Sequence, residues 1–171
     1  MTTSMRIACY SALILFFELA LIRYTAGYVR VFGFYLNFVL IATFLGMGVG
    51  LLRASQAARI RWLAVPASLL LFGAVAFYSK VRIAVPNDPN EFVWAIFAPG
   101  SVGTRQAPLA LVVVTLFTLC ALFFAPLGAL LGAEFRKLPA LRAYSFDVAG
   151  SLLGILAFAL LSALRLPPFI W

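Results

Sequence analysis

The feature that most constrains this chain is a series of long apolar runs, which charged residues rarely interrupt. A helix needs about 20 mainly apolar residues to cross the hydrocarbon layer of a membrane. Five segments fit this requirement: residues 7–24, 31–52, 62–79, 107–132 and 148–164. Only 11% of the residues are charged, against about 25% in a typical soluble domain. We therefore predict one all-α domain over residues 1–171, a polytopic transmembrane helix bundle.

The ends of the runs carry further signals. We interpret the first run as a retained span rather than a signal peptide, because Glu18 interrupts it and Ile22-Arg23-Tyr24 follows where small residues would mark cleavage. Asp88-Pro89-Asn90-Glu91 is typical of a helix start and predicts a short interfacial helix over residues 92–97. Pro126 predicts a bend or a tilt in the long fourth span.

Acid–base and metal-binding groups are scarce. The chain has no histidine, which excludes Ser-His-Asp and Cys-His catalysis and histidine-ligated metals. Its two cysteines, Cys9 and Cys120, are too few and too far apart for a zinc site. Gly46, Gly48 and Gly50 lie inside an apolar run rather than at a strand-to-helix turn, so they do not predict a dinucleotide site. We expect no catalytic residue, cofactor or metal ion.

Glu18 lies eleven residues after Ile7, and therefore about 16 Å into the first span. An ionised group near the bilayer centre costs roughly 2.5–3.5 kcal/mol, so it must be neutral, paired or exposed to a wet cavity. If the first two spans form a tight antiparallel hairpin, Asn37 lies level with Glu18 and is its expected partner; Arg23 is the alternative. Two interpretations stay open: a buried polar tie between helices, or a contact with a proton, cation or substrate.

Glycines four residues apart recur near the ends of three spans. They are Gly46 and Gly50, Gly128 and Gly132, and Gly150 and Gly154. Helices in lipid associate through close packing, and glycine lets their backbones approach each other. The pattern predicts tight helix–helix packing, the alternative being an accident of composition.

Asp147 directly precedes the predicted fifth span. An acid at that place can cap a helix and interact with its positive end, so we expect a capping role. A contact with a ligand or partner is the other interpretation.

The net charge of +8 favours an anionic partner. The basic residues lie between apolar runs, where phospholipid headgroups are the nearest anions, so we expect the lipid bilayer rather than nucleic acid. A cytoplasmic N-terminus places seven Lys and Arg residues in inside segments and six in outside segments. This small excess favours a cytoplasmic N-terminus.

Three strings of residues resemble one family. Residues 17–23 (FELALIR) place a glutamate five positions before an arginine, Phe32-Gly33 precedes FLGMGVG at residues 44–50, and residues 144–154 read YSFDVAGSLLG. These are similar to the membrane-embedded region of bacterial spermidine synthase-like proteins, in which a major-facilitator-like region is fused to an aminopropyltransferase domain. Asp147 stands where that family has an amide.

The resemblance implies a module of the bacterial inner membrane. The family's chemistry resides in a Rossmann-like domain that binds decarboxylated S-adenosylmethionine and a polyamine. This sequence has no matching glycine-rich turn or acid-rich pocket, so no catalytic residue carries over.

We therefore expect a non-catalytic integral membrane module, an anchor or accessory subunit that packs against a second copy or another membrane protein. The alternative is a protein that binds or transports a small molecule or polyamine-like cation through Glu18 and Asn37. An intramembrane enzyme is a third, weaker reading, because acid–base groups are lacking.

Overall fold

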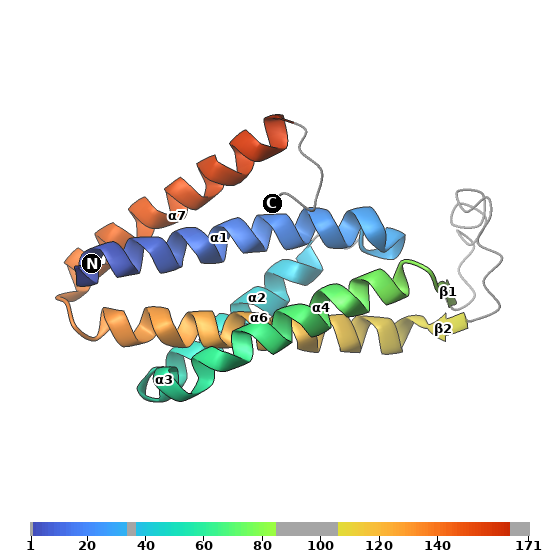
Figure 1. Ribbon diagram of the computed structural model, residues 1–171, viewed down its shortest axis with the longest axis horizontal. Helices are drawn as coiled ribbons and strands as arrows, with labels where there is room; N and C mark the ends of the chain where they lie inside the picture. The colour runs from blue at the N-terminus through green and yellow to red at the C-terminus, as the bar shows by residue number, and fades with distance from the viewer. Residues whose placement is uncertain (1, 34–36, 85–105, 165–171) are drawn as a thin grey trace.

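The computed structural model describes residues 2–33, 37–84 and 106–164 and shows a helical bundle (Figure 1). Four helical segments are long and apolar enough to cross a membrane: α1 (Thr3–Tyr28), Ala54–Tyr78, α6 (Leu109–Phe135) and α7 (Ala140–Ala163). A fifth apolar helix, α2 (Asn37–Leu52), has 16 residues and is about 24 Å long. The prediction of an all-α transmembrane bundle is confirmed.

Short elements join the long helices. The segment Ala54–Tyr78 is built from η2 (Ala54–Gln56), α3 (Ala57–Ile60), η3 (Arg61–Leu63) and α4 (Ala64–Tyr78). A 3-10 turn, η1 (Arg30–Gly33), follows α1. Two three-residue strands, β1 (Arg82–Ala84) and β2 (Gln106–Pro108), pair in parallel beside the start of α6. The helix predicted over residues 92–97 lies outside the described residues.

Helix ends differ from those read from hydropathy. α7 begins at Ala140 rather than at residue 148, because Pro139 presets an extended entry and the helix continues past the apolar run. α2 begins at Asn37 rather than at residue 31, since η1 occupies the first part of that run. α6 stays helical through Pro126, which is buried among its neighbours.

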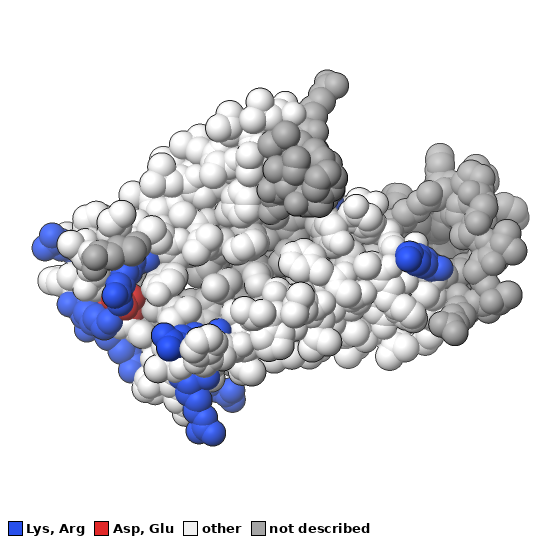
Figure 2. Space-filling model, in the orientation of Figure 1, with Lys and Arg blue, Asp and Glu red and all other residues white. Residues whose placement is uncertain are grey.

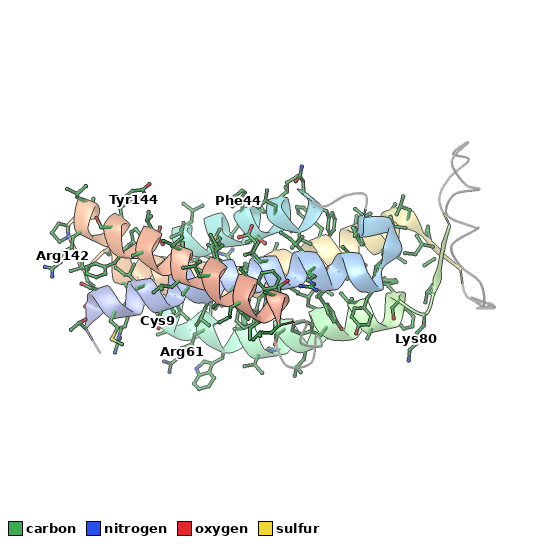
Figure 3. All side chains as sticks on the ribbon, turned by 90° about the horizontal axis from the view of Figure 1, so that it is seen from above. Cys9, Phe44, Arg61, Lys80, Arg142 and Tyr144 are labelled. Carbon is green, nitrogen blue, oxygen red and sulfur yellow. The ribbon has the colours of Figure 1, made fainter. Side chains whose placement is uncertain are left out.

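The helices are stacked in layers (Figure 1). In the lower layer α6 lies between α2 and α4; α1 lies above this layer and runs lengthwise along it, and α7 packs on α1 (Figures 1 and 3). α6 is the central helix, and its fully buried side chains include Leu116, Cys120 and Phe124. α7 lies at the edge of the bundle, since its main neighbour is α1.

Candidate functional site

The first close contact is between α1 and α7. Gly150 lies against Ala8, and Gly154 lies against Ala12. A Cβ atom added to Gly150 would stand 2.6 Å from Cα of Ala8, closer than real Cβ atoms approach. Because both residue numbers rise together, the two helices run parallel. The absence of a side chain at these glycines is therefore what permits this approach.

The second close contact is between α2 and α6, and here glycines come from both helices. On α2, Gly46 packs on Ala121 and Gly50 packs on Ala125 and Ala129. On α6, Gly128 packs on Met47, where an added Cβ would stand 2.7 Å from the carbonyl oxygen, and Gly132 packs on Leu51 and Ala54. All six glycines singled out in the sequence thus lie at two helix–helix contacts.

Polar side chains add two hydrogen bonds between α1 and α7. The hydroxyl of Ser11 donates to Oδ1 of Asp147, and Arg23 donates to the hydroxyl of Ser162. The capping role expected for Asp147 is wrong, because α7 begins seven residues earlier and Asp147 lies within the helix. Its carboxylate links two helices instead of closing the end of one.

Glu18 lies in the middle of the buried face of α1. This face consists of residues three and four apart: Ile7, Ser11, Ile14, Glu18, Leu21 and Thr25. The side chains of Ser11 and Thr25 reach the carbonyl oxygens of Ile7 and Leu21, at 2.9 and 2.6 Å. Glu18 is only 3% exposed, and its Oε1 has no hydrogen-bond partner among the described residues. A buried acceptor without a partner is costly, so this carboxyl group needs an explanation.

Asn37 does not supply that explanation. It is the exposed first residue of α2, and the described residues show no hydrogen bond between it and Glu18. The expected hairpin does not form, because η1 follows α1 and α2 packs closely on α6 rather than on α1. Arg23 bonds α7 instead. The structure therefore does not bring the predicted polar candidates together.

Glu134 is a buried acid that the sequence did not single out. It lies in the last turn of α6, is 6% exposed, and accepts through Oε1 from Arg6 at 3.4 Å and from Lys137 at 2.8 Å. Its Oε2 has no partner in the described part of the chain. An acid at a helix C-terminus is disfavoured by the helix dipole, so the two cations compensate it. The spacing of three residues between Glu134 and Lys137 could have indicated this ion pair from the sequence.

These groups do not form a reaction centre that the described residues can define. Glu18, Glu134 and Asp147 lie at separate places along the bundle, and each of the last two is engaged in a helix contact. Within residues 2–33, 37–84 and 106–164, no group of three His, Cys, Asp or Glu side chains could hold a metal ion.

Comparison with known proteins adds no relative. The chain matches no protein-family model, and no curated protein or solved structure is significantly similar to it. The fold and hydropathy define the class, which is a multi-pass helical membrane protein.

Proposed function

We propose that this protein is a non-catalytic module of the bacterial inner membrane, which serves as an anchor or accessory subunit and packs against a second copy or another membrane protein. The resemblance of residues 17–23, 44–50 and 144–154 to the membrane region of spermidine synthase-like proteins agrees with such a role. So does the engagement of Glu134 and Asp147 in helix contacts rather than in a common site.

The observation that carries the proposal is the uncovered face of α7. Among its residues, all within the described chain, only Ala143, Gly150 and Gly154 are buried. Its exposed large apolar side chains are Leu141, Tyr144, Val148, Leu152, Leu153, Ile155, Leu156 and Leu160. It is the least covered of the long helices. In a membrane, lipid chains or a partner helix can cover such an apolar surface, and the proposal assigns it to a partner helix.

The test is a pair of matched double variants. Leu153→Ala with Leu156→Ala changes the exposed face of α7, and Leu69→Ala with Leu70→Ala changes two leucines on α4 that are at least as exposed. The full chain is extracted in a mild detergent, and its mass and companions are measured by light scattering and mass spectrometry. We expect a stoichiometric complex that only the α7 variant weakens. A solitary chain in mild detergent, or equal effects of both variants, would contradict the proposal.

A second candidate function rests on the buried Oε1 of Glu18, which has no partner among the described residues. A cation or the amine of a small molecule would satisfy this oxygen. Under this proposal the protein binds or transports such a molecule through Glu18, without Asn37.

Thermal unfolding with and without spermidine tests this candidate. We expect spermidine to raise the melting temperature of the unaltered protein and not that of Glu18→Gln. Glu134→Gln is the control, because Glu134 lies at the end of α6 among cations. If all three proteins respond alike, the polyamine binds elsewhere and Glu18 is not its site.

A further inference from the structure

One end of the bundle gathers most of its basic side chains. Exposed cations come from the start of α1, the connection between α2 and α4, the end of α6 and the start of α7. They are Arg6, Arg53, Arg59, Arg61, Arg136, Lys137 and Arg142, hereafter the basic end. Figure 2 shows these blue side chains at the end that carries the N-terminus, while the long flank is almost uncharged.

The cations of the basic end are not neutralised within the described structure. Among the described carboxylates, Glu134 is the one that is paired there, and its partners are Arg6 and Lys137. The five remaining guanidinium groups form no ion pair with any described carboxylate. Like charges crowded at one end repel one another, so a partner that supplies several negative charges is favoured.

The level of these residues along the helices indicates which partner that is. Each cation stands where an apolar helix ends, and this is where lipid headgroups lie beside a membrane protein. Arg61 stacks over the ring of Trp62, with Cζ 4.9 Å from the ring centroid, and Trp62 is 69% exposed. A tryptophan with an exposed ring is typical of the headgroup level. Figure 3 shows Arg61 and Arg142 towards this end and Lys80 at the opposite end.

We propose that the basic end binds the phosphate groups of anionic phospholipids in the leaflet that it faces, which the positive-inside rule assigns to the cytoplasm. The planar guanidinium groups can each donate two parallel hydrogen bonds to one phosphate. The exposed arginines between α2 and α4 and those flanking the turn between α6 and α7 then share one layer of headgroups. This inference does not depend on which protein partner α7 has.

The test compares two lipids of equal chain length, phosphatidylglycerol and phosphatidylcholine. Their binding to the detergent-purified full chain is measured by titration in native mass spectrometry. We expect phosphatidylglycerol to bind more tightly. Because each basic residue near an anionic surface strengthens binding about fivefold, the combined change Arg53→Gln, Arg59→Gln and Arg61→Gln should weaken the first phosphatidylglycerol by at least about tenfold.

Three matched variants keep the proposal falsifiable. Lys80→Gln removes an exposed cation at the opposite end and should leave lipid selection intact. The combined change Arg53→Lys, Arg59→Lys and Arg61→Lys keeps the charge and should keep most of the selection. Arg136→Gln with Arg142→Gln changes the other part of the basic end and should weaken phosphatidylglycerol independently.

The proposal is wrong if both lipids bind alike, if higher salt leaves the preference for phosphatidylglycerol unchanged, or if Lys80→Gln weakens binding as much as the triple change does.

Discussion

Gly154 of α7 lies against the backbone of Ala12 of α1, so that a Cβ atom on the glycine would stand 2.9 Å from the carbonyl carbon of Ala12. Four residues earlier, Gly150 has the same relation to Ala8. The two helices therefore touch along one strip of small residues. The contact is this close because glycine has no Cβ atom at these two positions.

The first prediction concerns Gly154→Ala. The added methyl group must push α7 away from α1, and overpacking of this kind costs typically about 1–3 kcal/mol. We expect the free energy of unfolding, measured by denaturant titration in micelles, to fall by that amount. Gly73→Ala is the control, since nothing lies within 4 Å of a Cβ at that helical position. Equal effects at both positions would show that the contact is not tight.

The second prediction uses two glycines on the same helix. Gly50 faces Ala129, whose backbone nitrogen would lie 2.8 Å from an added Cβ, whereas Gly48 has open space. We expect Gly50→Ala to destabilise the α2–α6 pair and Gly48→Ala to leave it unchanged or slightly more stable, because alanine favours helix by up to about 1 kcal/mol. Thermal unfolding of both variants decides between them. The interface is misassigned if Gly48→Ala is the more harmful change.

The third prediction concerns the ion pair between Arg6 and Glu134. Arg6 has a half-exposed side chain, so its pairing contributes modestly, about 0.2–1 kcal/mol. A double-mutant cycle of Arg6→Gln and Glu134→Gln should give a coupling energy in this range that shrinks at high salt. Glu134→Gln alone should cost more than Arg6→Gln, because it also removes the negative charge that pairs with Lys137. A coupling energy of zero would mean that the pair contributes nothing to the joining of α1 and α6.

The fourth prediction concerns Glu18. Since its buried Oε1 has no partner among the described residues, Glu18→Leu removes a group that is costly to bury. We expect the free energy of unfolding to stay the same or rise, as measured by denaturant titration. Ser11→Ala, which removes the donor to Asp147, should instead destabilise the protein. A loss above about 1 kcal/mol in Glu18→Leu would reveal an interhelical bond to the carboxyl group.

The fifth prediction concerns the hydrogen bond between Asp147 of α7 and Ser11 of α1. If it joins α7 to α1, Asp147→Ala leaves the helical content unchanged and weakens the contact by about 1 kcal/mol. Hydrogen exchange of residues 140–146 should then remain slow. Fraying of this segment would contradict the prediction, because it would mean that Asp147 supports the first turns of α7 rather than its contact with α1. Ser11→Ala should not add to the effect of Asp147→Ala, because both remove the same bond.

The helical type of the bundle was predictable, because membrane thickness sets the length of apolar runs. Their number was predictable only approximately: five spans were predicted, and four described helical segments are long enough to cross, while α2 has 16 residues. Helix ends were less predictable, since hydropathy reports where lipid ends and not where the backbone stops being helical. α7 shows this: its first residues, from Ala140, include the charged Arg142 and lie outside the apolar run.

The glycine spacing identified the residues that make close contacts but not their partners. Gly46 contacts Ala121, but alanine is common in the apolar runs, so the sequence does not indicate which alanine a given glycine contacts. The prediction that Asn37 lies at the depth of Glu18 was wrong because it took consecutive spans to be close neighbours. Glu134 was missed because its partner Arg6 lies far away in the sequence.

The parallel pairing of α1 and α7 has a consequence for how the protein is made. Ser11 and Asp147 are 136 positions apart, so the first helix enters the membrane long before its main neighbour has been synthesised. Until then Ala8 and Ala12 of α1 lack the glycines of α7 that they contact in the finished bundle. The contact between α1 and α7 can therefore form only after all the intervening helices have been synthesised.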